Sequence, residues 1–367
     1  NFPDFVDEMH EHGLKYFGYI NSFFNIDGDL YKVAKEKNYC VKNQQGEDYL
    51  IYVTTFPAAL IDLTNPEAYD WIKEVIKKNL INEAHLDGWM SDFGEYLPPD
   101  AVLHSGISAK EYHNRYPVDW QKANYEAVQE AGRLGDIVYF TRSGYSHTSK
   151  YTTLVWGGDQ VPTFSMTDGL ASAIPAGLSL GVCGIGYHHT DVGGYTTFKP
   201  FFKRSKEVFM RWAEHSTFTM LMRSHEGNQP ENNVQFDSDD EILAHLAKMT
   251  QIHVHLKPYL KEISEYYVET GVPAMRALFL HYNDNPVVHQ IKYEYMLGPD
   301  LLVAPVVKKR KREWDVYIPG DEWIHVWSGN RYARGWHKVK SPIGSPPVFY
   351  RKGSKHEDLF KEIKKIQ

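Results

Sequence analysis

The sequence has little cysteine, no excess of basic residues and no long apolar run. Its two cysteines, Cys40 and Cys183, are too few for a disulfide framework and lack metal-ligand spacing, so a reducing, cytoplasmic setting is expected. Lys and Arg number 40 against 47 Asp and Glu, a formal net charge of -7, so a nucleic-acid partner is not expected. No apolar stretch is long enough to span a bilayer and no signal peptide is visible, so no membrane partner is expected.

The sequence does contain an alternation of short apolar runs with longer amphipathic ones, which is typical of β-α units around a parallel sheet. Strands are expected at residues 14–20, 86–92, 137–141, 153–156, 183–187 and 272–280. Helices are expected at residues 5–11, 69–80, 110–130, 169–180, 204–218 and 239–267. One helix start is well specified, because Asn65 can cap it, Pro66 suits its first position and Glu67 favours its positive end.

These expected strands predict a (β/α)8 TIM barrel. A closed barrel of this type has eight parallel strands, and only six are expected here, so the chain is predicted to begin inside a barrel that lacks its first strands. After about Tyr282 the sequence turns to Tyr-rich and Val-rich runs broken by Pro and Gly, which indicates a small all-β domain. We therefore expect the barrel in residues 1–285 and a C-terminal β-sandwich in residues 286–367. The basic run 308–312 within that domain is expected to be a solvated loop.

Two of the expected strands lead into an aspartate. Asp92 closes one apolar run, and Asp159 follows another after Gly157 and Gly158, which permit a close approach of the backbone. Barrels of this type build their active sites at the carboxyl ends of the strands. An isolated aspartate at such a place is more often a helix or turn cap. The occurrence of two such endings is what favours a catalytic role.

A pair of carboxyl groups suits glycoside cleavage with retention of configuration. That reaction needs one carboxylate to attack the anomeric carbon and one carboxylic acid to protonate the departing oxygen, with about 5–5.5 Å between the two groups. The nucleophile must stay charged, whereas burial and the charge of its neighbour should raise the pKa of the acid. The ends of neighbouring barrel strands can supply both groups.

Further residues could contribute to the same pocket. Arg142 lies at the end of a third strand, where it could form a structural salt bridge, hold a carboxylate ionised or bind a sugar hydroxyl. His188, His189 and Asp191 are metal-ligand types, but adjacent side chains on a strand point to opposite faces, which disfavours a metal site. Recognition of sugar hydroxyls by this segment is better supported, and His225 could join it. No cofactor is expected.

On these residues the chain resembles glycoside hydrolase family 31, and within it the sulfoquinovosidases. The resemblance runs from about Asn1 to the end of the chain, through the segments 87–98, 142–159, 168–176, 188–197, 222–227 and 346–350. It implies a retaining α-glycoside hydrolase in which Asp92 is the nucleophile and Asp159 the acid/base. The substrate-binding residues that it implies are Arg142, Trp156, Asp191, Tyr195 and His225.

Tyr195 carries the resemblance to the subgroup. It follows a glycine pair at a position where many family α-glucosidases have phenylalanine, and in the sulfoquinovosidases this tyrosine helps to bind the sulfonate. The resemblance therefore implies an α-sulfoquinovoside, such as sulfoquinovosyl glycerol, as substrate. It also implies an N-terminal β-sandwich, the first two barrel strands and a sulfonate-binding Arg and Trp in a part that would precede Asn1.

Other functions remain open from the sequence. An α-glucosidase or a transglycosylase on the same scaffold would use the same residues for bond cleavage, so only substrate screening and product analysis separate them. A non-catalytic sugar-binding protein could keep the barrel without the chemistry, although both carboxylates are present here. The expected partners are a small-molecule glycoside and either a second copy of this chain or a separate chain that completes the barrel.

Overall fold

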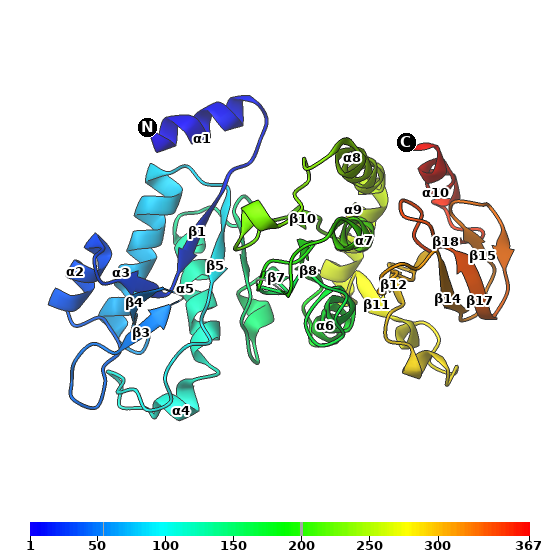
Figure 1. The fold of residues 1–367 in the computed structure, drawn as a ribbon. Coiled ribbons are helices and arrows are strands. Elements are labelled where there is room, and N and C mark those ends of the chain that lie inside the picture. Colours follow the sequence, from blue (N-terminus) through cyan, green and yellow to red (C-terminus); the bar gives the residue numbers. More distant parts are fainter. Residues whose placement is uncertain (54, 199–200) are drawn as a thin grey trace. The chain divides into compact units, whose positions relative to one another are not determined.

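The computed structural model describes residues 1–53, 55–198 and 201–367. The chain divides into two compact units, residues 1–155 and residues 156–367, and Figure 1 labels most of their helices and strands. The division falls inside strand β7 (Leu154–Trp156), so the residue at the carboxyl end of this strand belongs to the second unit.

The first unit is built on a parallel sheet. Its strands pair in the order β1 (Phe17–Asn21), β5 (Gly88–Asp92), β6 (Val138–Thr141) and β7. The strands predicted in these four segments are confirmed. Strand β5 is buried along its whole length, because it has a parallel neighbour on each side. Parallel strands end at the same edge of their sheet, so the carboxyl ends of β5 and β6 lie next to each other.

Helices make up much of the rest of the first unit. They are α1 (Phe2–Glu11), α2 (Asp29–Glu36), α3 (Pro66–Val75), the π-helix η1 (Ile76–Glu83), α4 (Ala109–Tyr112), α5 (Tyr116–Glu130) and the 3₁₀ turn η2 (Thr148–Lys150). The predicted start of α3 is confirmed, because the Asn65 side chain accepts a hydrogen bond from the Glu67 amide and Pro66 is the first helical residue. The single helix predicted at 110–130 is divided into α4 and α5.

An antiparallel sheet follows β1 in the sequence and was not predicted. It has the strand order β2 (Phe23–Asn25), β4 (Phe56–Leu60) and β3 (Leu50–Val53). Ala58, Ala59 and Leu60 of β4 are fully buried and share one core with Trp89 of β5 and Trp120 of α5. This core fixes the sheet that carries the end of β5.

The second unit begins with further β-α elements. They are α6 (Leu170–Val182), β8 (Tyr187–His189), β9 (Asp191–Val192), α7 (Lys206–Thr217), β10 (Arg223–Ser224), η3 (Pro230–Asn232), α8 (Asp240–His255) and α9 (Lys257–Thr270). The Gly157 amide, just after β7, donates to the His189 carbonyl oxygen at 2.8 Å, and β9 pairs in parallel with β10. The strand predicted at 183–187 starts only at Tyr187, because α6 and its capping residue extend to Cys183.

The end of the second unit is all-β, as predicted. One sheet has the order β11 (Met275–Ala277), β12 (Tyr295–Leu297), β13 (Leu301–Val303), β18 (Val348–Arg351), β15 (Trp323–His325) and β16 (Arg331–Tyr332), and a second pairs β14 (Glu313–Ile318) with β17 (Gly335–Lys340). Short helical segments are η4 (Leu278–Leu280), η5 (Val288–Gln290), α10 (Glu357–Glu362) and η6 (Ile363–Lys365). The assignment of residues 272–280 to a barrel strand is wrong, because β11 pairs antiparallel with β12.

The parallel strands form a partial barrel. Parallel ladders among the described residues join β1, β5, β6 and β7 in the first unit and β9 with β10 in the second, fewer strands than the eight of a closed barrel. This agrees with the partial barrel expected from the sequence.

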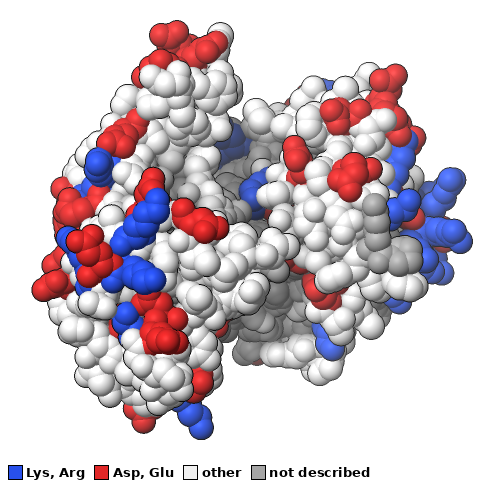
Figure 2. Space-filling model, turned by 60° about the vertical axis from the view of Figure 1, so that its left-hand side comes forward, with Lys and Arg blue, Asp and Glu red and all other residues white. Residues whose placement is uncertain are grey.

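The surface carries charges of both signs. Figure 2 shows separate groups of Asp and Glu and of Lys and Arg side chains on the visible face, with broad uncharged surface between them. Within the part of the chain that the structure describes, no helix is both long enough and apolar enough to cross a membrane.

Candidate active site

Asp92 is the last residue of β5, and its side chain is 8% exposed. The chain turns sharply after it, because Phe93 has a left-handed backbone conformation with a φ of 61° and Gly94 has a φ of 112°. This conformation is unfavourable for phenylalanine and persists only where the surroundings enforce it, often at functional sites. Here the Phe93 amide turns back and donates to Asp92 Oδ1 at 2.9 Å.

Arg142 directly follows β6 and faces the same carboxylate. Its Nε lies 3.3 Å from Asp92 Oδ1, and its guanidinium lies over the Phe93 ring, 4.2 Å from the ring centroid. Nε and Nη2 also donate to Glu95 Oε1, at 3.0 and 2.6 Å. Arg142 therefore forms a salt bridge with Glu95 and also lies beside the Asp92 carboxylate. These contacts fix a positive charge beside Asp92.

Two residues around Asp92 were not predicted. Tyr19, on β1, donates from its hydroxyl to Asp92 Oδ2 at 2.7 Å. Glu95 shares Arg142 with Asp92. Glu95 stands three residues after Asp92 and could have been noticed as a second carboxylate in the same segment, whereas no sequence signal relates Tyr19 to Asp92.

Asp159 lies in a loop of the second unit, three residues after β7, and is exposed. Gly158 before it has a φ of 82°, a backbone conformation that favours glycine. The Asp159 carbonyl oxygen accepts a hydrogen bond from Thr196 Oγ1 at 2.7 Å, and the Gln160 carbonyl oxygen accepts from the Tyr195 amide, also at 2.7 Å. The loops that carry Asp159 and Tyr195 are thus joined by hydrogen bonds.

The turn before Tyr195 requires both of its glycines. Gly193 and Gly194 have φ values of 88° and 77°, and a Cβ on Gly194 would lie 2.8 Å from the Cα of Pro162. Arg204, which is 1% exposed, donates from Nε to the Gly193 carbonyl oxygen at 3.2 Å and from Nη2 to that of Gly194. Arg204 was not predicted to belong to the site. It holds the turn that presents Tyr195.

Asp191 is a buried carboxyl group with two side-chain partners. Its Oδ1 pairs with Nη1 of Arg223, the residue opposite it on β10, and its Oδ2 accepts from Trp156 Nε1 at 3.2 Å. Burial raises the pKa of Asp191 to about 6, although the charge of Arg223 and the hydrogen bond from Trp156 lower it. Asp191 can therefore change its protonation state close to neutral pH. Arg223 was also missed by the sequence analysis.

His225 stands beside Tyr195. The two rings meet edge to face with 4.9 Å between centroids and 80° between their planes. The Gly227 amide donates to His225 Nδ1 at 3.0 Å. Burial, followed by the charge of Arg223, lowers the pKa of His225 to about 4, so the ring is neutral at physiological pH.

His188 and His189 occupy the buried end of β8. His188 packs against α6 so closely that a Cβ on Gly177 would lie 2.0 Å from its Nε2. Burial lowers the pKa of His188 to about 4 and that of His189 to about 3. Among the described residues, no group of three or more His, Cys, Asp or Glu side chains could hold a metal ion.

The structure collects the predicted residues into two groups. Asp92 and Arg142 are in contact in the first unit. The group in the second unit consists of Trp156, Asp159, Asp191, Tyr195 and His225.

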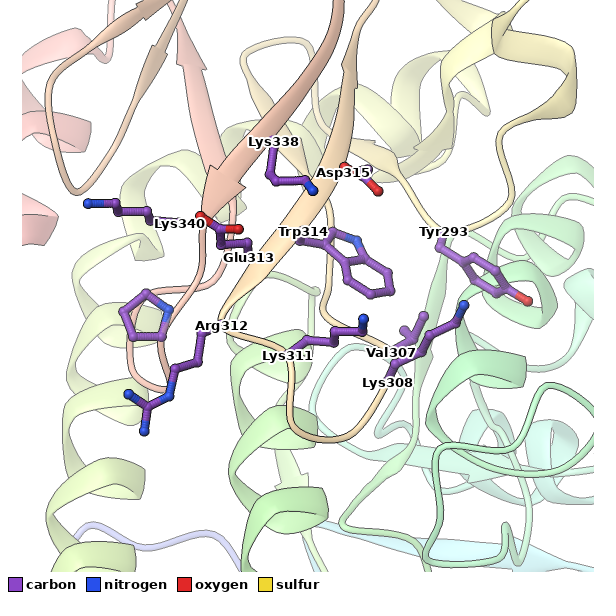
Figure 3. Close-up of a pocket in the computed structure, with 11 residues that line it drawn as sticks. Tyr293, Val307, Lys308, Lys311, Arg312, Glu313, Trp314, Asp315, Lys338 and Lys340 are labelled. Atoms are coloured by element: carbon purple, nitrogen blue, oxygen red, sulfur yellow. The ribbon is translucent and has the colours of Figure 1, made fainter.

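A separate cavity of about 810 Å³ lies in the second unit, among β14, β17 and the segment that leads into β14 (Figure 3). The basic residues 308–312, expected to be a solvated loop, contribute Lys308, Lys311 and Arg312 to its wall. Figure 3 shows the Trp314 indole between Lys338 and these lysines. Among the described residues that line it there is none of the predicted site residues.

The chain is similar to known glycoside hydrolases. The profile of the Glycosyl hydrolases family 31 TIM-barrel domain matches residues 1–263, and that of the Glycosyl hydrolase family 31 C-terminal domain matches residues 271–354. The sulfoquinovosidase of Escherichia coli (strain K12) is 48% identical over 369 residues, which cover 100% of this chain and 54% of the relative. The sulfoquinovosidase of Agrobacterium fabrum (strain C58) is 42% identical and is matched over 98% of this chain and 54% of its own length.

One solved structure is very similar to this chain. It is a GH31 family sulfoquinovosidase from E. rectale in complex with the aza-sugar inhibitor IFGSQ, with a TM-score of 0.97 and 45% identity. The match covers 100% of this chain and 55% of that one. The chain spans about half the length of the curated relatives that it matches, 54% in both cases. The two matching domain profiles nevertheless account for most of its residues, and the chain belongs to glycosyl hydrolase family 31.

Proposed function

We propose that the full-length protein is a retaining α-glycoside hydrolase that cleaves α-sulfoquinovosides through a covalent glycosyl-enzyme intermediate. The observation that carries this proposal is the setting of Asp92. It is a buried carboxylate at the carboxyl end of a parallel strand, and each of its oxygens faces a donor. Such a group is fixed in position and supported in its charged form, which a retaining nucleophile requires.

In the proposed reaction, an Asp92 oxygen forms a bond to the anomeric carbon while the bond from that carbon to the leaving oxygen breaks. The electron pair of the broken bond stays on the leaving oxygen, which takes a proton from Asp159. In the second step Asp159 accepts a proton from water, the water oxygen bonds to the anomeric carbon, and Asp92 departs as a carboxylate. The Phe93 amide and Arg142 support the charge on Asp92 before and after the cycle.

We propose that Arg142 in the first unit and Trp156, Asp191, Tyr195 and His225 in the second unit each contribute to substrate binding. Asp191 offers a carboxyl group held by Trp156, and His225 offers a neutral ring, so both can pair with sugar hydroxyls. Tyr195 is proposed to donate to the sulfonate, because a tyrosine after a glycine pair is the feature in which the chain resembles the sulfoquinovosidases. A cytoplasmic location fits the two unpaired cysteines. We also propose that the catalytic barrel ends and the C-terminal domain begins near residue 285, and that the chain associates with a second copy of itself.

A mechanism-based fluorosugar tests the nucleophile in the full-length protein. Labelling followed by peptide mapping should place the sugar on Asp92, and Asp92→Ala should abolish turnover. Labelling of a different carboxylate, or near-normal turnover by Asp92→Ala, contradicts the assignment. The substrate is tested by comparing kcat/KM for nitrophenyl α-sulfoquinovoside and nitrophenyl α-glucoside. Preference for the glucoside would identify an α-glucosidase of the same family.

A further inference from the structure

The carboxylate of Asp92 is held differently at its two oxygens. Oδ1 accepts from the Phe93 amide at 2.9 Å and lies 3.3 Å from Arg142 Nε. Oδ2 accepts from the Tyr19 hydroxyl at 2.7 Å. Rotation of an aspartate carboxyl group about its last torsion is soft, so donors on one oxygen alone do not fix its plane. The hydrogen bond from Tyr19 to Oδ2 holds the second oxygen and so fixes the plane of the carboxylate.

The direction of this hydrogen bond is set by Asn21. The Phe23 amide donates to Asn21 Oδ1 at 2.8 Å, which identifies that atom as the oxygen of the Asn21 side chain. Asn21 Nδ2 is then directed at the Tyr19 hydroxyl, to which it donates at 3.1 Å. Since the hydroxyl accepts from Asn21, its single proton is free to be donated to Asp92.

The pairing of β1 with β5 brings Tyr19, Asn21 and Asp92 together. β1 and β5 are parallel neighbours in which Tyr19 lies opposite Met90 and Asn21 opposite Asp92. Tyr19 and Asn21 are two positions apart on one strand, so their side chains leave the same face of the sheet. The side chains of Asn21, Tyr19 and Asp92 therefore form a chain of donors that ends on one carboxylate oxygen.

The tyrosine stays a donor over the range in which a glycosidase works. Partial burial and the charge of Asp92 both raise the pKa of Tyr19, so the hydroxyl keeps its proton at neutral and moderately alkaline pH. A neutral donor orients a carboxylate without neutralising it, unlike a second cation.

We propose that Tyr19 is a positioning residue that fixes the plane of the Asp92 carboxylate for attack on the anomeric carbon. The inference rests on the proposed function of Asp92. Asn21 acts through Tyr19, by directing the hydroxyl proton to Asp92 Oδ2. Tyr19 takes no part in bond formation or bond cleavage.

The test is Tyr19→Phe in the full-length protein, assayed with a nitrophenyl α-glycoside that the wild type cleaves. We expect kcat to fall by about 10- to 100-fold with little change in KM, because misplacement of a reacting group by about 1 Å costs on the order of 100-fold. The rate of labelling of Asp92 by the fluorosugar should fall by a similar factor, because labelling uses the same attack on the anomeric carbon. A purely structural role would lower the melting temperature rather than slow attack at an unchanged KM.

A matched control is Tyr52→Phe, which removes a hydroxyl from a tyrosine that is 75% exposed on β3. It should leave kcat, KM and the rate of fluorosugar labelling unchanged. A second arm combines Asn21→Ala with Tyr19→Phe. If Asn21 acts through Tyr19, its replacement slows the wild type but has little further effect in Tyr19→Phe.

The result that overturns the inference is a Tyr19→Phe enzyme in which kcat and the rate of fluorosugar labelling both stay within about twofold of the wild type. Fluorosugar labelling of the wild type separates this failure from failure of the proposed function. If the wild type is labelled at Asp92 but the activity of Tyr19→Phe is unchanged, only the proposed role of Tyr19 is wrong. Labelling at another residue removes the proposed nucleophile itself. A thermal melt of Tyr19→Phe that matches the wild type shows that lost activity does not come from unfolding.

Discussion

Arg204 donates from Nε to the carbonyl oxygen of Gly193 at 3.2 Å, inside the second unit. Its Nη2 binds the Gly194 carbonyl oxygen, so one guanidinium holds both residues of the turn that leads to Tyr195. Burial lowers the pKa of Arg204 to about 10, which still leaves it charged at neutral pH. Because the buried guanidinium of Arg204 binds backbone carbonyl groups, we infer that it stabilises the conformation of the turn.

The first prediction concerns this turn. Replacing Arg204 by lysine keeps the charge but removes the planar fork that binds two carbonyl groups. We expect the turn to open more often, with the amides of Tyr195, Thr196 and Thr197 exchanging about 10- to 100-fold faster, which corresponds to about 1–3 kcal/mol for a lost hydrogen bond to a charged group. Hydrogen exchange read by mass spectrometry or NMR measures this directly.

Arg211→Lys is the matched control for Arg204. Arg211 is another buried arginine of the second unit, but it pairs with Glu214 and binds the carbonyl oxygens of Lys311 and Ser341. Its replacement should lower the melting temperature without selective exchange at residues 195–197. Equal exchange at these amides in both variants would mean that Arg204 has no special role in the turn.

The second prediction concerns the acid/base. Asp159→Ala should slow cleavage of glycosides with poor leaving groups by about 10²- to 10⁴-fold, the usual contribution of general acid catalysis. Activated aryl glycosides need little protonation of the leaving oxygen, so their first step should suffer far less. Measuring kcat/KM across aryl leaving groups of increasing pKa gives a steeper dependence in the variant than in the wild type.

Asp168→Asn provides the control for Asp159. Asp168 lies nine residues further along the chain, and its Oδ1 accepts from the Val161 amide at 3.1 Å. This replacement removes a nearby negative charge without removing the proposed acid, so the dependence on the leaving group should stay that of the wild type. If Asp159→Ala slows good and poor leaving groups equally, the proton comes from elsewhere.

The third prediction concerns the sulfonate. Tyr195→Phe keeps the ring that stands edge to face with His225 and removes only the hydroxyl. We expect kcat/KM for the α-sulfoquinovoside to fall by the equivalent of about 0.5–3 kcal/mol, towards the upper end because the acceptor is charged, while the value for the α-glucoside changes little. Tyr187→Phe, which loses a hydroxyl bound to Ser264 at 2.7 Å, is a control for general effects on the unit. Equal losses for both substrates would remove Tyr195 from sulfonate recognition.

Much of the fold could be predicted because its signals are local. The apolar runs before Asp92 and Arg142 and the cap at Asn65 each follow from a few neighbouring residues, and the structure has strands or a helix at those places. The segment 272–280 was misassigned for a physical reason. A short apolar run shows that a strand is buried, but it does not show whether its neighbours are parallel or antiparallel.

The residues of the site that were missed depend on pairing between distant segments. Tyr19 reaches Asp92 because β1 pairs with β5 in a particular register, and Arg223 reaches Asp191 because β10 pairs with β9. Arg204 reaches its carbonyl partners only through the positive φ of two glycines. None of these residues belongs to a motif that reveals its partner. Aspartates at strand ends can be read from a sequence, whereas the groups that orient them require the register.

Glu294 gives a prediction on stability that is independent of the site. Its side chain lies in the all-β part of the second unit and is 4% exposed. Oε1 accepts from the Tyr317 amide at 3.0 Å, and among the described residues Oε2 has no hydrogen-bond partner. Burial raises the pKa of Glu294 from 4.5 to about 8, although the Tyr317 amide lowers it. The folded protein therefore prefers the neutral carboxyl group.

The sign of the pH dependence follows from this raised pKa. Between about pH 4.5 and pH 8 the folded state holds a proton on Glu294 that the unfolded state has lost, so the free energy of unfolding falls as pH rises, by at most about 1.4 kcal/mol per pH unit. Glu294→Gln keeps the shape and stays neutral, so it should remove this slope and raise the melting temperature most at about pH 8. Glu313→Gln, at the exposed start of β14, should leave the slope as it is. The measurement is the melting temperature of the wild type, Glu294→Gln and Glu313→Gln between pH 5 and 8.5. If the melting temperatures of the wild type and Glu294→Gln change with pH in parallel, ionisation of Glu294 does not lower the stability of the folded state.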